Sequence, residues 1–157
     1  MTRDTNIKIK AIVLLPVVGV TAFLFHFVWE MWQAPFYQGM SEASHWSSVI
    51  LCSRASFGDA FIAMFAYLLV AWVSRNFAWI YKMKMGWCWM YIATGLVITL
   101  ILEYLATEVF DRWQYSEIMP QLWGLGTGIT PIIQWLIVPL VSLWAARIFC
   151  LGLNRRK

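Results

Sequence analysis

Charged side chains are scarce in this chain. Asp, Glu, Lys and Arg make up 13% of its 157 residues, whereas a water-soluble domain usually has about 25%. A soluble domain of this size must cover its surface with polar side chains, so the deficit excludes that class. Hydrophobic residues reach 61%, and the 11 Trp, 10 Phe and 6 Tyr are of the type that collects at membrane interfaces. The composition predicts a single transmembrane domain over residues 1–157.

Cysteine is also rare, and the basic residues do not gather into one positively charged surface. Cys52, Cys88 and Cys150 lie far apart without metal-ligand spacing, which predicts free thiols. The net charge is +4, but Lys and Arg gather near the two ends of the chain and in one short connection, unlike the basic face that nucleic acid requires. No nucleic-acid partner and no cofactor are therefore predicted. Haem is disfavoured because the second histidine, His45, lies in a loop.

Four apolar stretches are long enough to cross a membrane. About 20 helical residues span roughly 30 Å of hydrocarbon, and the stretches lie near 11–32, 48–74, 87–109 and 129–150. Backbone polar groups in lipid must be satisfied within a helix or a closed barrel, and long runs with short connections favour helices. The sequence predicts an all-α, antiparallel four-helix bundle. The connection FAWIYKMKMGW (77–87) is expected to form an interfacial turn.

Lys and Arg predict the orientation, because they accumulate on the cytoplasmic side of membrane proteins. Ten of them lie before the first stretch, between the second and third, or at the end of the fourth and beyond it. The opposite side has only Arg112 outside the stretches. Both termini are therefore predicted to be cytoplasmic, in a bacterial inner membrane or, for a eukaryotic chain, in the endoplasmic reticulum membrane.

This orientation places the intramembrane polar residues in one layer, in the outer half of the bundle. An ionisable group inside a membrane helix costs roughly 2.5–3.5 kcal/mol and usually faces the bundle interior or a wet cavity. Singly, each residue has an ordinary structural explanation, such as a hydrogen bond along or between helices. Together they predict a site composed of His26, Glu30, Arg54, Asp59, Glu103, Glu108 and Gln134.

The connection after the third stretch, DRWQYSEIMPQLWGLGTGITP, is rich in aromatic residues, Pro and Gly. This composition predicts an ordered cap over the outer end of the bundle. Trp113, Tyr115 and Trp123 are expected to anchor the cap at the membrane interface. An ordinary aromatic belt explains about half of the aromatic residues of the connection equally well.

Three short motifs indicate a relative. HFVWE contains His26 and Glu30, TEVFDRWQY contains Glu108 and Trp113, and WLIVP contains Trp135. The arrangement resembles the EXPERA superfamily, four-helix membrane proteins that include the emopamil-binding sterol isomerase. Its first span has a His-x-x-x-Glu motif, its third ends in Thr-Glu before an acidic, aromatic loop, and its fourth has a Trp four residues before a Pro.

The resemblance has departures as well as implications. The asparagine that precedes the family's Trp falls on Ile132 here, and neither Arg54 nor Asp59 has a counterpart that can be placed. The family likeness implies a cavity for a lipophilic ligand among the helices. It also implies isomerisation of a double bond by acid–base chemistry.

The residue roles follow from that resemblance. His26 and Glu30 would form one proton-transfer unit and Glu108 the other, while the Trp135 ring would stabilise a developing cation. The predicted function is binding of a lipid, isoprenoid or sterol-like ligand in an outer-half cavity, as a homodimer or within a larger membrane complex, with membrane lipids as further partners. The predicted ligand-binding residues are Arg54, Asp59, Glu103, Trp113, Tyr115, Gln134 and Trp135.

Three other functions stay open. A transporter or ion-conducting subunit would use Asp59, Glu103 and Glu108, although the inner half of the bundle has no polar path. A carboxylate and histidine metal site would suit iron or manganese, but the Glu-x-x-His pairs that di-iron bundles carry within their helices are absent from the four stretches, and no metal is predicted. An accessory subunit of a membrane complex is the third alternative.

The predicted orientation can be measured with reporter fusions after Lys157. Green fluorescent protein should fluoresce at this position and alkaline phosphatase should stay inactive, because the charge asymmetry holds the C-terminus in the cytoplasm. A fusion at Ser41, in the first outer connection, is the matched control and should give the opposite pattern. The reverse result at both positions would invert the topology.

Overall fold

Long helices account for most of the molecule. The computed structural model describes residues 2–122 and 127–155, with side chains described for 13–122 and 127–153. The long helices in this part are α1 (Thr2–Gln33), α2 (His45–Val73), α3 (Met85–Tyr104) and α4 (Ile129–Arg155). Three short turns accompany them: η1 (Ala34–Phe36) and η2 (Trp79–Lys82) are 3₁₀-helical, and η3 (Leu105–Val109) is π-helical. The predicted all-α class is confirmed.

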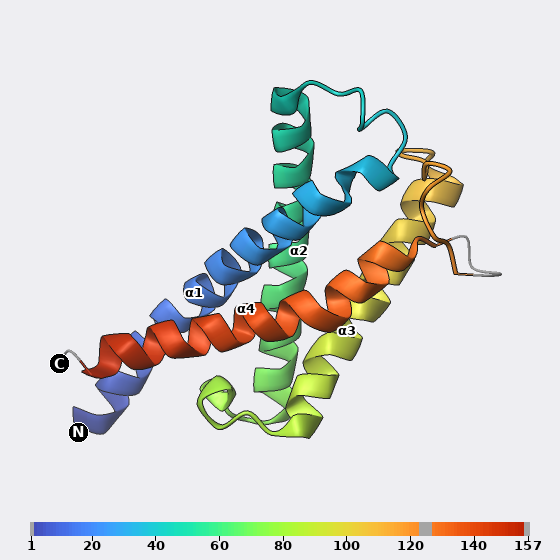
Figure 1. Cartoon of the computed structure of the whole chain (residues 1–157). Helices are drawn as coiled ribbons and strands as arrows, with labels where there is room; N and C mark the ends of the chain where they lie inside the picture. The colour runs from blue at the N-terminus through green and yellow to red at the C-terminus, as the bar shows by residue number, and fades with distance from the viewer. Residues whose placement is uncertain (1, 123–126, 156–157) are drawn as a thin grey trace.

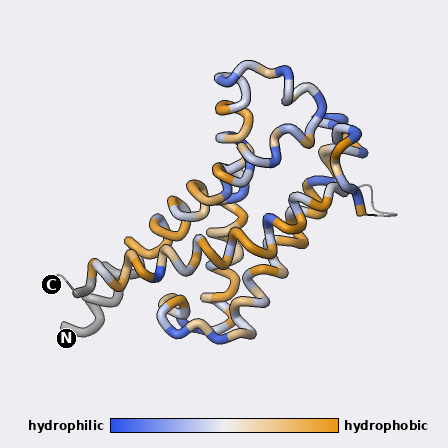
Figure 2. The backbone as a smooth tube through the Cα atoms, viewed as in Figure 1, coloured by the Kyte–Doolittle hydropathy of each residue, from blue (hydrophilic) through white to orange (hydrophobic). Residues whose placement is uncertain are grey.

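Each long helix contains a stretch that is long and apolar enough to cross a membrane. The stretches are Val13–Phe36, His45–Val73, Met85–Val109 and Ile129–Leu153, with mean hydropathies of 1.7 to 2.1. They agree with the four predicted spans, and the chain is an integral membrane protein. Figure 2 shows the apolar residues running along the helices, with hydrophilic residues concentrated in the connections.

The four helices form a closed antiparallel ring. Each helix packs on its neighbours in sequence, and α4 returns to pack on α1. Both termini lie at one end of the bundle, and the α1–α2 and α3–α4 connections lie at the other, here called the distal end (Figure 1). The antiparallel arrangement is confirmed, while the side of the membrane that each end faces stays a prediction.

Small residues let α1 and α2 approach closely. Ala22 of α1 and Ala63 of α2 are fully buried, and a Cβ atom on Gly19 would lie 2.6 Å from Sδ of Met64. Lipid tails are as apolar as the helices, so membrane helices associate through close packing and interhelical hydrogen bonds. The α1–α2 crossing provides the close packing.

The turn η2 folds back beneath the bundle at the end that holds the termini. Trp79 and Ile80 are 1% and 0% exposed, and the indole of Trp79 donates a hydrogen bond to the backbone oxygen of Tyr67 over 3.3 Å. Their rings stack with centroids 5.1 Å apart. The turn lies between the second and third membrane-crossing stretches, so the expectation of an interfacial turn stays a prediction. Two of its residues pack into the bundle, because a buried indole needs a hydrogen-bond partner and Trp79 has one.

Gly95 determines how closely α3 approaches α4 beside the polar layer. A Cβ atom on Gly95 would lie 1.9 Å from Cζ3 of Trp135 and 2.2 Å from Cε3. The indole of Trp135 is 0% exposed, so no space is available into which it could move. Glycine is therefore required here for the close approach of a ring to the backbone.

Replacing Gly95 by Ala should destabilise the bundle by about 1–3 kcal/mol, the usual cost of overpacking a core. Thermal unfolding in detergent, followed by circular dichroism, measures the change. Gly58→Ala is the matched control, because Gly58 lies in α2 with nothing within 4 Å of its Cβ position, and alanine there should be neutral or gain up to about 1 kcal/mol. Equal unfolding temperatures for the two variants would contradict the close packing at Gly95.

Candidate functional site

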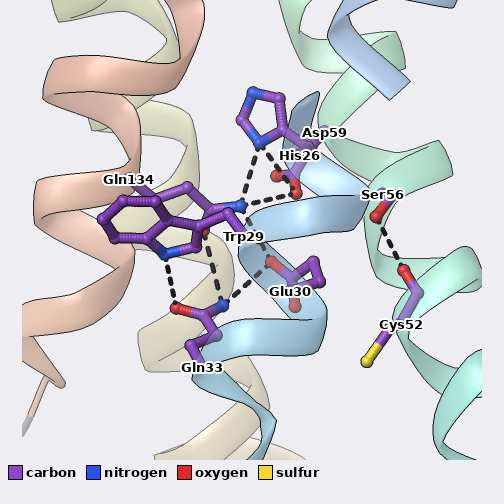
Figure 3. Close-up of polar contacts among 8 residues, drawn as sticks. All are labelled: His26, Trp29, Glu30, Gln33, Cys52, Ser56, Asp59 and Gln134. Atoms are coloured by element: carbon purple, nitrogen blue, oxygen red, sulfur yellow. Dashed lines mark hydrogen bonds and ion pairs between the residues drawn. The ribbon is translucent and has the colours of Figure 1, made fainter. Parts of the chain in front are cut away.

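The amide of Gln134 joins the polar residues of three helices. Its Nε2 atom lies 2.9 Å from Oε1 of Glu30 on α1 and 3.3 Å from Oδ2 of Asp59 on α2, and it lies 2.9 Å from Nδ1 of His26. Gln134 is 2% exposed. Figure 3 shows these side chains converging between the helices. Together with Gln33 they are called the acid–amide cluster below.

Gln33, which the sequence pattern did not single out, completes this cluster. It is 2% exposed and donates hydrogen bonds to Oε1 of Glu30 over 2.9 Å and to Oε1 of Gln134 over 3.5 Å. Its own oxygen accepts a hydrogen bond from the indole of Trp29 over 3.0 Å. The available signal was spacing, since Gln33 lies three residues after Glu30 and four after Trp29, on one helix face.

His26 is the most deeply buried ionisable side chain in the cluster. Its Nδ1 atom lies 3.2 Å from Oδ2 of Asp59, and the two side chains are 0% and 12% exposed. The imidazole also contacts the indole of Trp135, with ring centroids 5.1 Å apart. Neither Nε2 of His26 nor Nε1 of Trp135 has a hydrogen-bond partner among the described residues. Buried polar atoms of this kind are uncommon and often mark functional positions.

Glu103 of α3 is bound by the connection that follows its helix. Its Oε2 atom accepts a hydrogen bond from the Tyr115 hydroxyl over 2.5 Å and one from the Trp113 indole over 3.4 Å. Trp113 is 39% exposed, so it lies at the rim while Tyr115 reaches inward. Two of the three predicted ligand-binding aromatics, Trp113 and Tyr115, therefore contact a predicted site carboxylate.

Tyr115 and Tyr37 cover the distal end of the site. Their rings lie 5.5 Å apart, and their backbones form an isolated antiparallel bridge. Two backbone hydrogen bonds of 2.9 Å flank the bridge, from Gln38 to Gln114 and from Ser116 to Phe36. The α1–α2 and α3–α4 connections are thus joined into one structure, called the tyrosine cap below. An ordered cap over this end is confirmed for the described residues, and Trp123, the third expected anchor, lies outside them.

The carboxylates act on the tyrosine cap electrostatically. Burial raises the pKa of Tyr37 far above its ordinary value, and the charges of Glu103 and Glu30 raise it further. Burial also raises the pKa of Tyr115, with the Glu103 carboxylate adding to the shift. Both hydroxyls therefore remain protonated and can act as hydrogen-bond donors throughout the physiological pH range.

Two of the predicted site residues lie outside these contacts. Arg54 is exposed on α2. Asp59 lies five positions further along, which turns the two side chains about 140° apart around the helix, and Asp59 pairs with His26. Glu108 is exposed in η3, where its charge acts on Tyr115. Their predicted roles stay predictions.

The described carboxylates do not form a metal centre. Among residues 13–122 and 127–153, no group of three His, Cys, Asp or Glu side chains could hold a metal ion. The carboxylate oxygens that carry hydrogen bonds are instead occupied by amide, indole and phenol donors. The arrangement therefore suits proton transfer and hydrogen bonding.

A groove opens on the outside of the bundle between α1 and α4. Its volume is about 480 Å³ and its walls are almost entirely apolar. Trp29 belongs to both the groove and the acid–amide cluster, because the same indole lines the groove and donates to Gln33. The lining residues are Phe25, Val28, Trp29, Trp32, Ile137, Val138 and Val141.

The raised pKa of Tyr115 can be tested by spectrophotometric titration. Tyrosine ordinarily ionises near pH 10, so the absorbance difference between the wild-type chain and Tyr115→Phe should have no tyrosinate step at that pH. Because the folded state holds this proton more tightly than the unfolded chain, the stability contribution is complete below pH 10 and declines as the pH rises through the folded pKa. A normal step near pH 10 in folded protein would refute burial of this hydroxyl.

Comparison with known proteins gives one partial likeness. No family model matches the chain, and no solved structure matches it. The chain is 32% identical over 85 residues to a subunit of NADH-quinone oxidoreductase from Polaromonas sp. (strain JS666 / ATCC BAA-500). The matched stretch covers 53% of this chain but only 22% of that relative.

Proposed function

We propose that the chain binds a lipid, isoprenoid or sterol-like molecule at the acid–amide cluster and isomerises a double bond in it by acid–base chemistry. The observation that carries the proposal is the convergence of His26, Glu30 and Asp59 on one amide, Gln134, inside a membrane bundle. Ionisable groups at such positions are expensive and are usually functional.

The lateral groove supports a lipophilic ligand. The groove lies within the membrane-spanning parts of α1 and α4, so a hydrocarbon chain reaches it from the bilayer without crossing water. Trp29 separates the groove from Gln33 and the polar side chains beyond it. A ligand with an apolar body and a reactive or polar part therefore finds both environments side by side.

The cluster contains the groups that isomerisation needs. In this reaction an acid adds its proton to one alkene carbon, and the other carbon becomes a carbocation. A base then removes a proton from a neighbouring carbon, and the electrons of that C–H bond form the new double bond. The proton removed balances the proton added, so the acid is restored once the base returns a proton to it.

Glu30 is suited to the acid and His26 to the base. Two amide donors bind the same oxygen of Glu30, Oε1, so Oε2 is the oxygen that would carry a transferable proton. The Trp135 ring beside His26 offers an aromatic face to a developing cation. The resemblance to the EXPERA superfamily instead places His26 and Glu30 in one proton-transfer unit and gives the other to Glu108, so the separate roles of Glu30 and His26 belong to this proposal alone.

A second candidate is a subunit of a membrane complex. The likeness to the oxidoreductase subunit favours it, and the acid–amide cluster would then accept or pass protons within the assembly. The chain spans 22% of that relative's length, so the relative's activity as a whole is no guide to this chain.

Native mass spectrometry of the protein extracted in mild detergent separates the two candidates. The first predicts a co-purifying lipophilic molecule of about 300–500 Da, a size that a groove and site of this kind can hold. Incubation in D₂O should then place deuterium on a carbon of that molecule, because the acid exchanges its proton with solvent before each transfer. Recovery only with other protein subunits, and no deuterium on any retained lipid, would favour the second candidate.

Glu30→Gln should reduce the rate of deuterium incorporation by about 10²-fold or more, the usual contribution of a general acid. Gln keeps the size of the side chain and removes its transferable proton. Glu42→Gln, at an exposed position in the α1–α2 connection, is the matched control and should retain the rate. Glu108→Gln tests the role implied by the family resemblance: loss of incorporation assigns it the second proton transfer, and an unchanged rate removes it from the site.

A further inference from the structure

We infer that Asp59 holds His26 in the tautomer with its proton on Nδ1. The contacts alone carry this assignment of the proton, and its role in catalysis rests on the proposed function. The buried Nε2 atom is then an unprotonated base. Asp59, which has no counterpart in the sequence motifs, becomes a positioning residue for the reaction, and Nε2 of His26 becomes the atom that accepts the ligand's proton.

The number of hydrogens on Gln134 limits what the cluster can do. An amide nitrogen carries two hydrogens, but three possible acceptors surround it: Nδ1 of His26 and Oε1 of Glu30, each at 2.9 Å, and Oδ2 of Asp59 at 3.3 Å. One of the three contacts therefore has no hydrogen from Gln134.

The amide of Gln134 is also prevented from turning over. Its oxygen accepts a hydrogen bond from Nε2 of Gln33 over 3.5 Å, and Gln33 is oriented in turn because its oxygen accepts the indole hydrogen of Trp29 over 3.0 Å. Since an indole nitrogen only donates, the chain of contacts has one direction. The hydrogens of Gln134 must point toward His26, Glu30 and Asp59.

The two neutral tautomers of His26 differ in how many hydrogen bonds they complete. With the proton on Nδ1, His26 donates to Oδ2 of Asp59 across the observed 3.2 Å, and Gln134 donates to Glu30 and Asp59. The 2.9 Å approach of Nδ1 to Nε2 of Gln134 is then a contact between two donor atoms without a hydrogen bond. With the proton on Nε2, Nδ1 and Oδ2 face each other as two acceptors, and the Nε2 hydrogen is a buried donor without a described partner. The first tautomer uses all three hydrogens, and a carboxylate in the same position selects the tautomer of histidine in hydrolase triads.

The free lone pair points away from the carboxylates. Figure 3 shows the second ring nitrogen of His26 directed away from Asp59 and Gln134, and the side chain is fully buried. The Trp135 indole lies beside the ring. Nε2 is therefore the ring atom left to accept a proton, and the imidazolium formed in this way stays paired with Asp59.

Nitrogen NMR of the imidazole tests the tautomer without any ligand. The chain has two histidines, so His45→Gln, a change in an exposed residue, leaves His26 as the single signal in ring-labelled protein in lipid at neutral pH. The expected spectrum has a protonated Nδ1 and a strongly downfield-shifted, unprotonated Nε2. A protonated Nε2 would overturn the inference, both in the neutral tautomer with an unprotonated Nδ1 and in an imidazolium. The proposed lipid binding would then still be decided by its own experiment, the native mass spectrometry.

Two further variants in the same background identify the positioning residue. Asp59→Asn removes the charge that favours Nδ1–H, so the downfield Nε2 signal should lose intensity to the other tautomer. Ser56→Ala is the matched control, because Ser56 lies one turn earlier on α2 and donates to the backbone oxygen of Cys52; its spectrum should equal that of the parent. An unchanged spectrum for Asp59→Asn would show that Asp59 does not select the tautomer.

Discussion

Carboxyl groups inside a membrane bundle need hydrogen-bond donors, and few donors lie within reach of them. The packing of the four helices depends on where these donors lie. Glu30, Asp59 and Glu103 lie on three different helices, and the donors that reach them belong to two glutamines, one histidine and two aromatic residues. In a low-dielectric interior an unpaired polar group is costly. The relative positions of the helices are therefore tied to the side chains that supply these hydrogens.

Two structural features meet this requirement in different ways. Within the membrane, Gln134 reaches from α4 to the acidic groups of α1 and α2, so one amide links three helices. At the distal end, the hydroxyl of Tyr115 satisfies Glu103 of α3, and the backbone bridge to Tyr37 connects this part to the end of α1. The cap is thus part of the same polar system, and its order follows from the carboxylate that it binds.

The tight packing around the cluster has a chemical consequence. Trp135 is pressed against Gly95 on one side and contacts the His26 ring as well. The imidazole consequently has a fixed neighbour and a fixed carboxylate partner, and little freedom to change its orientation. Preorganised groups of this kind contribute most to catalysis when they do not have to rearrange during the reaction. The lateral groove is apolar, and Trp29 both lines it and donates a hydrogen bond to Gln33 of the acid–amide cluster.

The resemblance to sterol isomerases and the partial likeness to an oxidoreductase subunit lead to different proposals, and both depend on proton movement at this cluster. His26 and Glu30 belong to the motif that suggested acid–base chemistry. Asp59 and Gln33 belong to no motif, yet each contacts a residue of that pair directly. The chemistry of the site is therefore wider than the motif that pointed to it.

The amino-acid sequence by itself determined the membrane class, the four spans and the layer that holds the polar residues, because hydropathy and helix length depend only on local composition. It could not determine which members of that layer meet. Arg54 and Asp59 are close in sequence but lie on different faces of α2, whereas Asp59 and Gln134 are 75 residues apart and in contact. It also could not determine that Trp79, in the connection between the second and third stretches, is buried against Tyr67. Such contacts depend on the rotation of each helix about its axis, which the nearly uniform apolar composition of the spans leaves undefined and only the packing of all four helices decides.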